Sequence, residues 1–398
     1  MKKLLLLGGD HLLMPVINAA HELGCHVITC DYLPDNIAHK YSDEYFNAST
    51  TDKDSILEFA KNSKIDGVLT FTDSGVVAAG YVAEKLRLPS PGPYESIKIL
   101  QNKALFRDFL KKNEFNVPVA KGYESIEDAI VDLDRFRFPV IVKPVDSAGS
   151  KGVSKVDGVE GVENAVKFAL EYSMSKHFII EEFIEKKGCS SDCDCFSVDG
   201  EMKAVYFSSQ HFDTKSDNQY TPASYSWPST ISDENQRVLR DELQRLISLL
   251  GMRTSIYNVE VRESVEGIPY IMEVSPRGGG NRLAEMVRYA TGVDMIRNSV
   301  RMALGIRTEH IDTKPFNGYW AEIILHSNRS GIFNRLEIDQ KMLKNVVETD
   351  LWVKDGDEIH EFSSARFAIG TLVMRFEDAG ELEKAISKQS EWLKVMVK

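Results

Sequence analysis

The first 97 residues alternate short apolar runs with segments of helical periodicity. The apolar runs predict buried strands at Lys3–Leu7, His26–Cys30 and Gly67–Phe71. The segments that follow them predict helices over Met14–Leu23, Ile56–Asn62 and Ser74–Leu86. Thr51 and Asp54 resemble a capping box for the second helix. This alternation predicts a parallel, doubly wound sheet.

Pro89, Pro91 and Pro93 mark a boundary after this region. A helix is expected over Tyr94–Asn113, followed by a compact unit over 118–187. Within that unit, the pattern predicts helices near Ser125–Phe136 and at Val162–Ser173, with strands at Pro139–Lys143 and Phe178–Glu182.

The rest of the chain changes character near residue 310. Strands and long helices alternate before it, including a helix over Glu234–Leu250, whereas the tail is mostly strand-like with a closing helix over Gly380–Leu393. The chain therefore predicts a mixed α/β (α+β) fold in three parts, 1–97, 98–310 and 311–398.

Composition narrows the classes of function. The 398 residues carry a net charge of −12, which argues against non-specific binding to nucleic acid or to an anionic membrane. No apolar run approaches the roughly 20 residues of a membrane span. The run Leu4–Leu7 is expected to be a buried strand, because Gly8 and Gly9 end it too early for a secretion signal. Five cysteines argue against a disulfide framework, so the expected compartment is the reducing cytoplasm.

The Gly8–Gly9 turn follows the first predicted strand and could cradle a phosphate. It lacks the full glycine fingerprint of a dinucleotide-binding turn. A tight strand-to-helix turn is therefore favoured over a Rossmann cofactor site.

The strongest chemical signal is a strand that delivers a lysine to a loop of small residues. Lys143 ends an apolar run, and the loop Ser147–Gly152 follows it, including Gly149 and Ser150. Small residues let backbone N–H groups approach phosphate oxygens, and the lysine adds a cation beside them. The P-loop pattern is absent. The segment predicts a phosphate-binding loop of another type, with a surface hairpin turn as the alternative.

A second segment, 178–185, is apolar with two glutamates in its middle. Glu181 and Glu182 precede Phe183 and Ile184. Such a segment could be a hinge whose backbone hydrogen-bonds adenine while apolar side chains sandwich the base. A core strand with exposed glutamates is the alternative.

Two glutamates, Glu260 and Glu273, predict a metal site. They lie in strand-like runs on either side of a polar turn, 263–267, which suits an antiparallel hairpin with both carboxylates on one face. Mg²⁺ typically binds through a few carboxylates plus nucleotide phosphates. Arg277 and three glycines, 278–280, follow at once and suit an anionic substrate or a transferring phosphoryl group. A solvated hairpin is the alternative.

Three cysteines, Cys189, Cys193 and Cys195, have a spacing that zinc could use, with His211 as the nearest fourth ligand. Strand cysteines that face a core are favoured over a zinc site. The segment 208–213, which contains His211, is interpreted instead as a wall of the substrate pocket.

In this order, the three segments resemble the ATP-grasp superfamily, and Asn102–Arg107, with Lys103, resembles its entry into the nucleotide-binding fold. The resemblance covers nearly the whole chain. It implies a pre-ATP-grasp domain over 1–97, a two-lobed ATP-grasp domain over 98–310 with its small lobe at about 118–187, and a small closing domain over 311–398. Carbamoyl-phosphate synthetase, glycinamide ribonucleotide synthetase and biotin carboxylase are similar enzymes.

The resemblance also implies roles for single residues. ATP would be bound by Lys103, Lys143, the loop residues Ser147, Gly149, Ser150 and Gly152, and the hinge residues Glu181, Glu182, Phe183 and Ile184. Mg²⁺ would be bound by Glu260 and Glu273. Arg277 and Lys143 would be catalytic, and the substrate would contact Arg277, Gly279, Gly280, Asn281 and His211.

Two positions depart from the family pattern. Ser275 stands where many members place an asparagine ligand, so a second Mg²⁺ would be held more weakly or through water. A ribose-binding glutamate is missing after the hinge, and either Asp192 or Asp194 could replace it, with Asp194 as the residue expected.

The function implied by the resemblance is ATP- and Mg²⁺-dependent ligation. A small-molecule carboxylate would be activated as an acyl phosphate and coupled to an amine, with release of ADP. A carboxylase-like or kinase-like enzyme without amide formation and a non-catalytic nucleotide-binding regulator are the alternatives. Dimers are common among similar enzymes, so a homodimer is one state that the resemblance allows.

Overall fold

The N-terminal region forms a four-stranded sheet in a computed structural model that describes residues 1–213 and 221–398. All neighbours are parallel, in the order β3-β2-β1-β4. The strands are β1 (Lys3–Leu7), β2 (His26–Asp31), β3 (Glu44–Asn47) and β4 (Gly67–Thr70), and the helices are α1 (Met14–Glu22), α2 (Lys53–Ser63) and α3 (Asp73–Leu86). This arrangement confirms the predicted doubly wound sheet.

For the N-terminal part of the chain, one strand was missed and two local predictions were wrong. The edge strand β3 was not predicted, because its four residues are exposed or half-buried and carry no apolar run. Helix α2 is capped by Asp52, whose carboxylate accepts from the Ser55 amide, and not by a Thr51–Asp54 capping box. The helix expected over 94–113 is broken at Asn102, which has extended backbone angles and caps the second piece.

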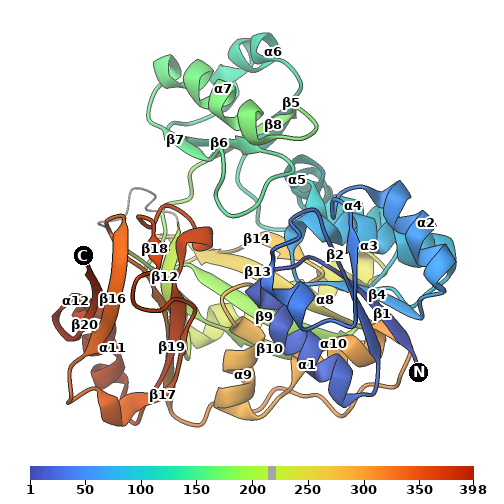
Figure 1. Ribbon diagram of the computed structural model, residues 1–398. Helices are drawn as coiled ribbons and strands as arrows, with labels where there is room; N and C mark the ends of the chain where they lie inside the picture. The colour runs from blue at the N-terminus through green and yellow to red at the C-terminus, as the bar shows by residue number, and fades with distance from the viewer. Residues whose placement is uncertain (214–220) are drawn as a thin grey trace.

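The small lobe is a four-stranded antiparallel sheet in the order β5-β8-β6-β7. Its strands are β5 (Ala120–Tyr123), β6 (Val140–Pro144), β7 (Ser154–Val156) and β8 (Phe178–Glu182), and its helices are α6 (Ile126–Val131) and α7 (Val162–Tyr172). Helices α4 (Tyr94–Gln101) and α5 (Lys103–Lys112) lead into it. Figure 1 shows this lobe standing above the rest of the molecule.

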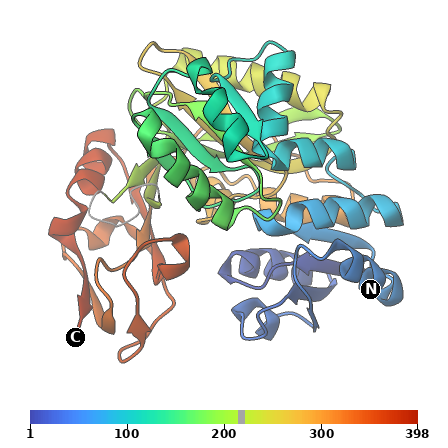
Figure 2. The same cartoon turned by 90° about the horizontal axis from the view of Figure 1, so that it is seen from above.

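The central part is built on an antiparallel sheet in the order β10-β9-β13-β14. Its strands are β9 (Ser191–Val198), β10 (Glu201–Phe207), β13 (Ser255–Glu263) and β14 (Pro269–Ser275), and its helices are α8 (Asp233–Leu249), α9 (Leu283–Thr291) and α10 (Met295–Ala303). In Figure 2, the N-terminal and C-terminal parts lie on different sides of this centre.

The C-terminal region is mostly strand, as predicted. A five-stranded sheet has the order β11-β12-β15-β19-β17, with β11 (Ser209–Phe212), β12 (Pro222–Trp227), β15 (Tyr319–Leu325), β17 (Val346–Leu351) and β19 (Gly370–Phe376). A second sheet contains β16 (Gly331–Ile338), β18 (Glu358–Ile359) and β20 (Leu393–Val397), and the helices are α11 (Ala379–Ser387) and α12 (Gln389–Trp392). Because β11 and β12 precede residue 310, this sheet joins the middle of the chain to its tail.

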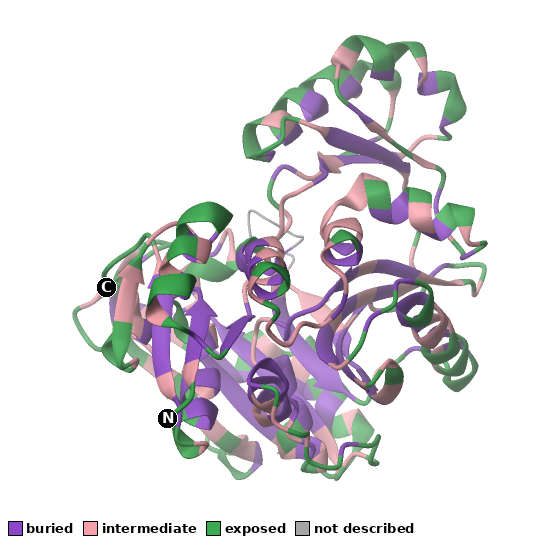
Figure 3. Cartoon of the chain, turned by 90° about the vertical axis from the view of Figure 1, so that its right-hand side faces the viewer, coloured by how far each residue is buried: buried purple, intermediate pink, exposed green. Residues whose placement is uncertain are grey.

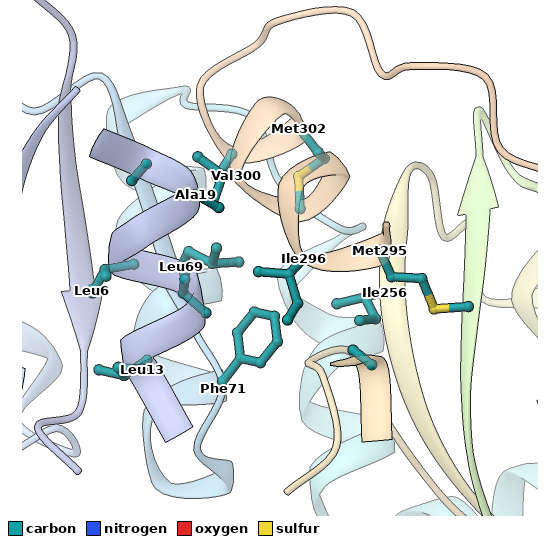
Figure 4. Close-up of a cluster of buried hydrophobic side chains, with 14 of the residues drawn as sticks. Leu6, Leu13, Ala19, Leu69, Phe71, Ile256, Met295, Ile296, Val300 and Met302 are labelled. Carbon is teal, nitrogen blue, oxygen red and sulfur yellow. The ribbon is translucent and has the colours of Figure 1, made fainter. Parts of the chain in front are cut away.

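A shared apolar core holds the N-terminal sheet against the central part. Leu6, Leu69 and Phe71 from the first region pack with Ile256 and Ile296 from the second. Figure 4 shows these side chains between the two regions, and Figure 3 shows that buried residues concentrate in the strands. Burial at roughly 25 cal/mol per Å² of apolar surface fixes the relative position of the two regions. Among the described residues, no helix has the length and apolar character needed to cross a membrane.

Candidate active site

The two predicted metal glutamates face each other across a hairpin. Glu260 of β13 is the register partner of Glu273 of β14, so both side chains lie on one face of the sheet. Both are about one-third exposed, at 39% and 32% of the side chain. Two partly exposed carboxylates side by side repel each other, and together they favour a divalent cation between or beside them, although Lys103 lies near Glu273 and Arg262 lies 3.6 Å from Glu260.

Lys103 connects this hairpin to the loop of the small lobe. It is the first residue of α5, and its Nζ lies 3.2 Å from Glu273 Oε2 and donates to the Ser147 carbonyl at 2.7 Å. Asn102 fixes this position, because its side chain accepts from the amides of Ala104 and Leu105. A cation is therefore held between the carboxylates and the loop.

Lys143 and Arg107 share one buried glutamate. Glu181 is 2% exposed, forms an ion pair with Lys143, and accepts from Arg107 Nε at 3.0 Å. Burial alone would raise the pKa of Glu181, but the charges of Arg107 and Lys143 lower it to about 2. Burial lowers the pKa of Lys143, and the nearby cations Arg107 and Lys103 add to this effect. An anionic ligand beside Lys143 would favour its charged form.

The loop Ser147–Gly152 has the backbone that its small residues predict. Gly149, Ser150 and Gly152 adopt positive φ angles of 67°, 57° and 71°. A Cβ atom on Gly149 would meet no atom within 4 Å, whereas one on Gly152 would lie 2.9 Å from the Pro144 side chain. The loop is therefore open at Gly149 and close-packed at Gly152, shortly before β7 begins at Ser154.

The hinge residues are tied to the two neighbouring lobes. The Phe183 amide donates to the Pro139 carbonyl at 3.0 Å, and the Ile184 carbonyl accepts from Arg262 Nη1 at 3.3 Å. Glu182 accepts from the Arg137 amide at 2.9 Å. Glu181 therefore contributes its side chain to an ion-pair network, a contact that the sequence interpretation did not include.

Arg277 is buried and paired with a residue that sequence reasoning missed. Asp73 begins α3, and its carboxylate accepts from Arg277 Nε at 2.8 Å and from Arg277 Nη2 at 2.7 Å. Burial alone would raise the pKa of Asp73, but the charge and hydrogen bonds of Arg277, together with Lys103 and Ser275, lower it. The signal for Asp73 was its place directly after β4, since side chains at the carboxyl ends of parallel strands often form sites.

Ser275 belongs to this same network. Its hydroxyl donates to Asp73 Oδ1 at 3.2 Å and accepts from Gln101 Nε2 at 2.9 Å. Ser275 is 2% exposed. The hydroxyl is therefore engaged with Asp73 and Gln101, whereas Glu260 and Glu273 expose part of their carboxylates.

The glycines after Arg277 allow a close approach of backbone to buried side chains. A Cβ on Gly278 would lie 2.1 Å from the Phe71 ring, and one on Gly279 would lie 2.5 Å from Leu283. Gly280 is open, with its nearest atom at 3.9 Å. Asn281 follows with a positive φ of 53° and donates to the Tyr225 hydroxyl at 3.1 Å.

Asp192 and Asp194 lie on β9, beneath this glycine loop. Asp194 Oδ1 accepts from the Gly279 amide at 2.9 Å, and Asp192 Oδ1 accepts from Asn258 Nδ2 at 2.6 Å. Burial raises the pKa of Asp192 to about 8 and that of Asp194 to about 7. The structure thus brings both acids to the glycine loop, and Asp192 is also the register partner of Glu260.

His211 points to the opposite face of β11 from its neighbour Gln210. It contacts Cys189 at 3.7 Å and Ser226 at 2.9 Å. The neighbouring Gln210 side chain contacts Tyr225, since adjacent strand residues point to opposite faces. Burial lowers the pKa of His211 to about 4, so the ring is neutral near pH 7.

The cysteines do not form the zinc site that their spacing allowed. Cys193 and Cys195 are buried in the core, with their sulfur atoms 3.7 Å apart. Within residues 1–213 and 221–398, no group of three or more histidine, cysteine or acidic side chains converges to hold a metal ion. The core interpretation is confirmed for Cys193 and Cys195, whereas Cys189 is half-buried beside His211. This finding also means that a cation at Glu260 and Glu273 would need further ligands, such as nucleotide phosphates.

A family model and several relatives support the assignment of this region. Residues 136–285 match the family described as ATP-grasp domain. A formate-dependent phosphoribosylglycinamide formyltransferase from Synechococcus sp. is 34% identical over 186 residues, covering 46% of this chain and 48% of the relative. The large chain of carbamoyl phosphate synthase from Thermoanaerobacter sp. is 26% identical over 235 residues, covering 58% and 20%. The chain thus spans about half or less of these relatives.

Solved structures share the fold over the full length. An L-amino acid ligase from Bacillus licheniformis gives a TM-score of 0.81 at 20% identity, covering 100% of this chain and 99% of that chain. A phosphoribosylglycinamide synthetase from Anaerococcus prevotii gives 0.76 at 20% identity, covering 100% of both. Identities this low support the fold alone. Residues 136–285 of this protein therefore match an ATP-grasp domain, within a chain that shares its overall fold with the solved L-amino acid ligase and phosphoribosylglycinamide synthetase.

Proposed function

We propose that this protein is an ATP- and Mg²⁺-dependent ligase that joins a small-molecule carboxylate to an amine. The observation that carries the proposal is the pairing of Glu260 with Glu273 across the hairpin, with Lys103 3.2 Å from Glu273. This combination of paired acids and a bridging lysine suits a metal-bound triphosphate. The names of the formyltransferase, synthase and ligase relatives agree with ATP-driven chemistry.

The phosphate end of ATP would lie between Lys103, Lys143 and the loop 147–152. Lys143 would exchange part of its contact with Glu181 for a phosphate oxygen, while Arg107 keeps that glutamate charged. Glu260 and Glu273 would hold Mg²⁺, which when bound neutralises phosphate charge and orients the γ-phosphoryl group. Adenine would occupy the hinge at Glu181–Ile184. Asp194 accepts from the Gly279 amide and Asp192 lies 3.5 Å from the Tyr225 hydroxyl, so both acids are proposed for the substrate side of the site and not for the ribose.

The proposed chemistry has two steps. An oxygen of the substrate carboxylate attacks the γ-phosphorus of ATP, the bond from that phosphorus to the bridging oxygen breaks, and ADP leaves. The nitrogen of the amine then attacks the acyl carbon, the carbon–oxygen bond to phosphate breaks, and the nitrogen releases one proton. Arg277, held by Asp73, would stabilise the negative charge near the acyl phosphate.

The substrate end would be formed by the loop after Arg277. Gly279 and Gly280 leave backbone close to the site, and Asn281 presents its amide toward Tyr225.

The five cysteines are free thiols in the described structure, which supports the reducing cytoplasm as the place where this enzyme works.

The test is a screen of carboxylate and amine pairs for phosphate release with Mg²⁺-ATP. A pair that gives phosphate and ADP in equal amounts, together with an amide product, supports the ligase. Phosphate release without an amide supports a carboxylase-like or kinase-like enzyme. Binding of ATP by calorimetry with no turnover for any pair supports a nucleotide-binding regulator and contradicts the proposal.

A further inference from the structure

Five polar side chains meet where the central sheet, the glycine loop and the C-terminal sheet come together. This junction cluster consists of Asp192, Gln210, Tyr225, Asn281 and Glu322. The Tyr225 hydroxyl is at its centre, because it lies 3.5 Å from Asp192 Oδ2, 3.4 Å from Gln210 Nε2 and 3.1 Å from Asn281 Nδ2. The members come from β9, β11, β12, β15 and the loop before α9.

Glu322 is the member without a partner. It is the register partner of Tyr225, so the two side chains share one face of the sheet. The residue is 0% exposed, and neither carboxylate oxygen has a hydrogen-bond partner among the residues that the structure describes. Burial of an unpaired acid costs several kcal/mol, and buried polar groups in folded proteins are nearly always paired. A bound ligand that pairs with Glu322 would offset this cost and would explain why a glutamate occupies the position.

The cations near these acids are already paired with other acids. Arg282 is the cation whose charge acts on Glu322, and Arg277 is the cation whose charge acts on Asp192 and Asp194. Arg282 contacts Glu285 at 3.0 Å and Glu348 at 2.6 Å. Arg277 is held by Asp73 in two hydrogen bonds. Burial raises the pKa of Glu322 well above its ordinary value, and Arg282 opposes this only in part.

Asp192 and Asp194 extend the excess of acid from Glu322 toward the glycine loop. Asp194 is 1% exposed, and its Oδ2 has no hydrogen-bond partner in the described structure. Three acids therefore share this region, while the two nearby arginines are matched by acids elsewhere. Burial disfavours the charged form of these acids, so a cationic ligand that donates several hydrogen bonds would stabilise them as carboxylates.

The geometry favours an organic cation over a metal ion. Across the described ranges, the acids of this region do not converge into a group that could hold a metal. An ammonium group instead has three donors on a tetrahedral centre, and a hydrocarbon body next to it can contact apolar walls. Such walls are present, because Trp227, Met286 and Val373 belong to the same buried cluster as Tyr225. Figure 1 shows α9 between the central and C-terminal sheets at this place.

We propose that the junction cluster binds the amine substrate as a primary ammonium ion, with Glu322 as its principal acceptor. The inference rests on the proposed function, because it assigns the amine of that reaction to a particular place. Asn281 links the junction cluster to the proposed acyl phosphate site, since it is in the loop that follows Arg277 and also contacts Tyr225. The amine would thus be held next to the loop where the acyl phosphate is expected.

The experiment is calorimetry on the full chain saturated with a non-hydrolysable ATP analogue and Mg²⁺. The probes are the common L-amino acids, ethanolamine and putrescine, each compared with its N-acetylated form. At least one free amine is expected to bind, and its N-acetylated form is not. Glu322→Gln keeps the shape and removes the charge, so it is expected to weaken amine binding by about tenfold to a hundredfold, the range for a hydrogen bond to a charged group.

A stability measurement separates ligand binding from a structural role. Glu322→Gln is expected to keep or raise the melting temperature of the unliganded protein, because it removes a buried unpaired acid. Tyr225→Phe is a second variant that removes only the hydroxyl, and weaker binding of the same amine is expected. Glu358→Gln replaces an exposed glutamate of β18, in the other C-terminal sheet, and is expected to leave amine affinity unchanged.

The outcomes separate this inference from the proposed function. If the wild-type chain fails to bind the ATP analogue, the proposed function fails. If it binds the analogue but none of the free amines, only the assignment of the amine site is overturned. Unchanged amine affinity in Glu322→Gln would also overturn the assignment of the amine site, whatever the melting temperature of the variant.

Discussion

The two ends of the candidate site manage charge in opposite ways. At the phosphate end, Lys143 and Arg107 surround Glu181, and Lys103 lies beside Glu273. The junction cluster contains the acids Asp192 and Glu322. In the described structure, the nearby arginines are already paired, Arg277 with Asp73 and Arg282 with Glu285 and Glu348. The phosphate end therefore suits an anionic ligand with its metal, whereas the junction cluster suits a cation. A ligase that joins a phosphorylated acid to an amine needs both environments within one site.

The largest expected effect comes from removing a metal carboxylate at the phosphate end. Glu273→Ala is expected to lower substrate-dependent ADP release by more than about a hundredfold, because Mg²⁺ and Lys103 lose a shared partner. The measurement is ADP formation with the carboxylate and amine pair found by screening. Glu266→Gln, in the exposed turn of the same hairpin, is the control and is expected to keep activity. Retention of most activity in Glu273→Ala would remove the basis of the metal assignment.

The second test removes the buried ion pair between Asp73 and Arg277. Asp73→Asn leaves Arg277 without its anionic partner in a buried position and is expected to cost about 3 kcal/mol of unfolding free energy. Urea unfolding measures this loss. Glu95→Gln removes an exposed ion pair with Lys98 and is expected to change stability by less than about 1 kcal/mol. Equal losses of unfolding free energy in the two variants would show that the buried ion pair stabilises the protein no more than the exposed one.

A pH series tests whether Glu181 is held charged by its two cations. Its pKa falls from the ordinary value of 4.5 to about 2 in the folded protein. A lowered folded-state pKa gives stability that is present above the unfolded value and is lost as the pH falls from about 4.5 through about 2. The expected loss is about 3 kcal/mol, from about 1.4 kcal/mol for each pKa unit.

Glu181→Gln is expected to flatten this acid limb of the curve of unfolding free energy against pH. Glu182→Gln, the neighbouring residue, pairs with Arg137, which is 90% exposed, so its effect on stability is expected to stay below about 1 kcal/mol. If the unfolding free energy of Glu181→Gln fell with pH as much as that of the wild-type protein, the ion pairs of Glu181 with Arg107 and Lys143 would not be the cause of the acid dependence.

The smallest expected effect concerns the glycine loop that connects the two ends. Gly278→Ala would place a Cβ 2.1 Å from the Phe71 ring and is expected to cost about 2 kcal/mol through overpacking. Gly280→Ala meets its nearest atom at 3.9 Å and is expected to be almost neutral for stability. Thermal unfolding of the two variants checks the difference. Equal melting temperatures would show that the loop moves freely away from Phe71.

The sequence was most informative where function depends on local pattern. The run ending at Lys143, the small-residue loop after it and the two glutamates of the hairpin are each encoded by neighbouring residues, and strand alternation predicts that Glu260 and Glu273 share a face. The parallel sheet of residues 1–97 followed from the same periodicity. A break at Asn102 inside the predicted helix was missed, because its capping contacts and tertiary position outweigh helical spacing.

Only the tertiary structure brought together residues that lie far apart in the chain. Asp73 and Arg277 are separated by 204 positions, and Glu181 meets an arginine 74 positions before it. Tyr225 and Glu322 become neighbours because β12 and β15 pair in one sheet. Periodicity specifies which face of an element is buried, but the partner on that face depends on how whole sheets and helices pack. The sequence thus predicted the lysines, the loop and the paired glutamates of the proposed phosphate end, whereas packing decided the partners of Glu181 and the junction cluster.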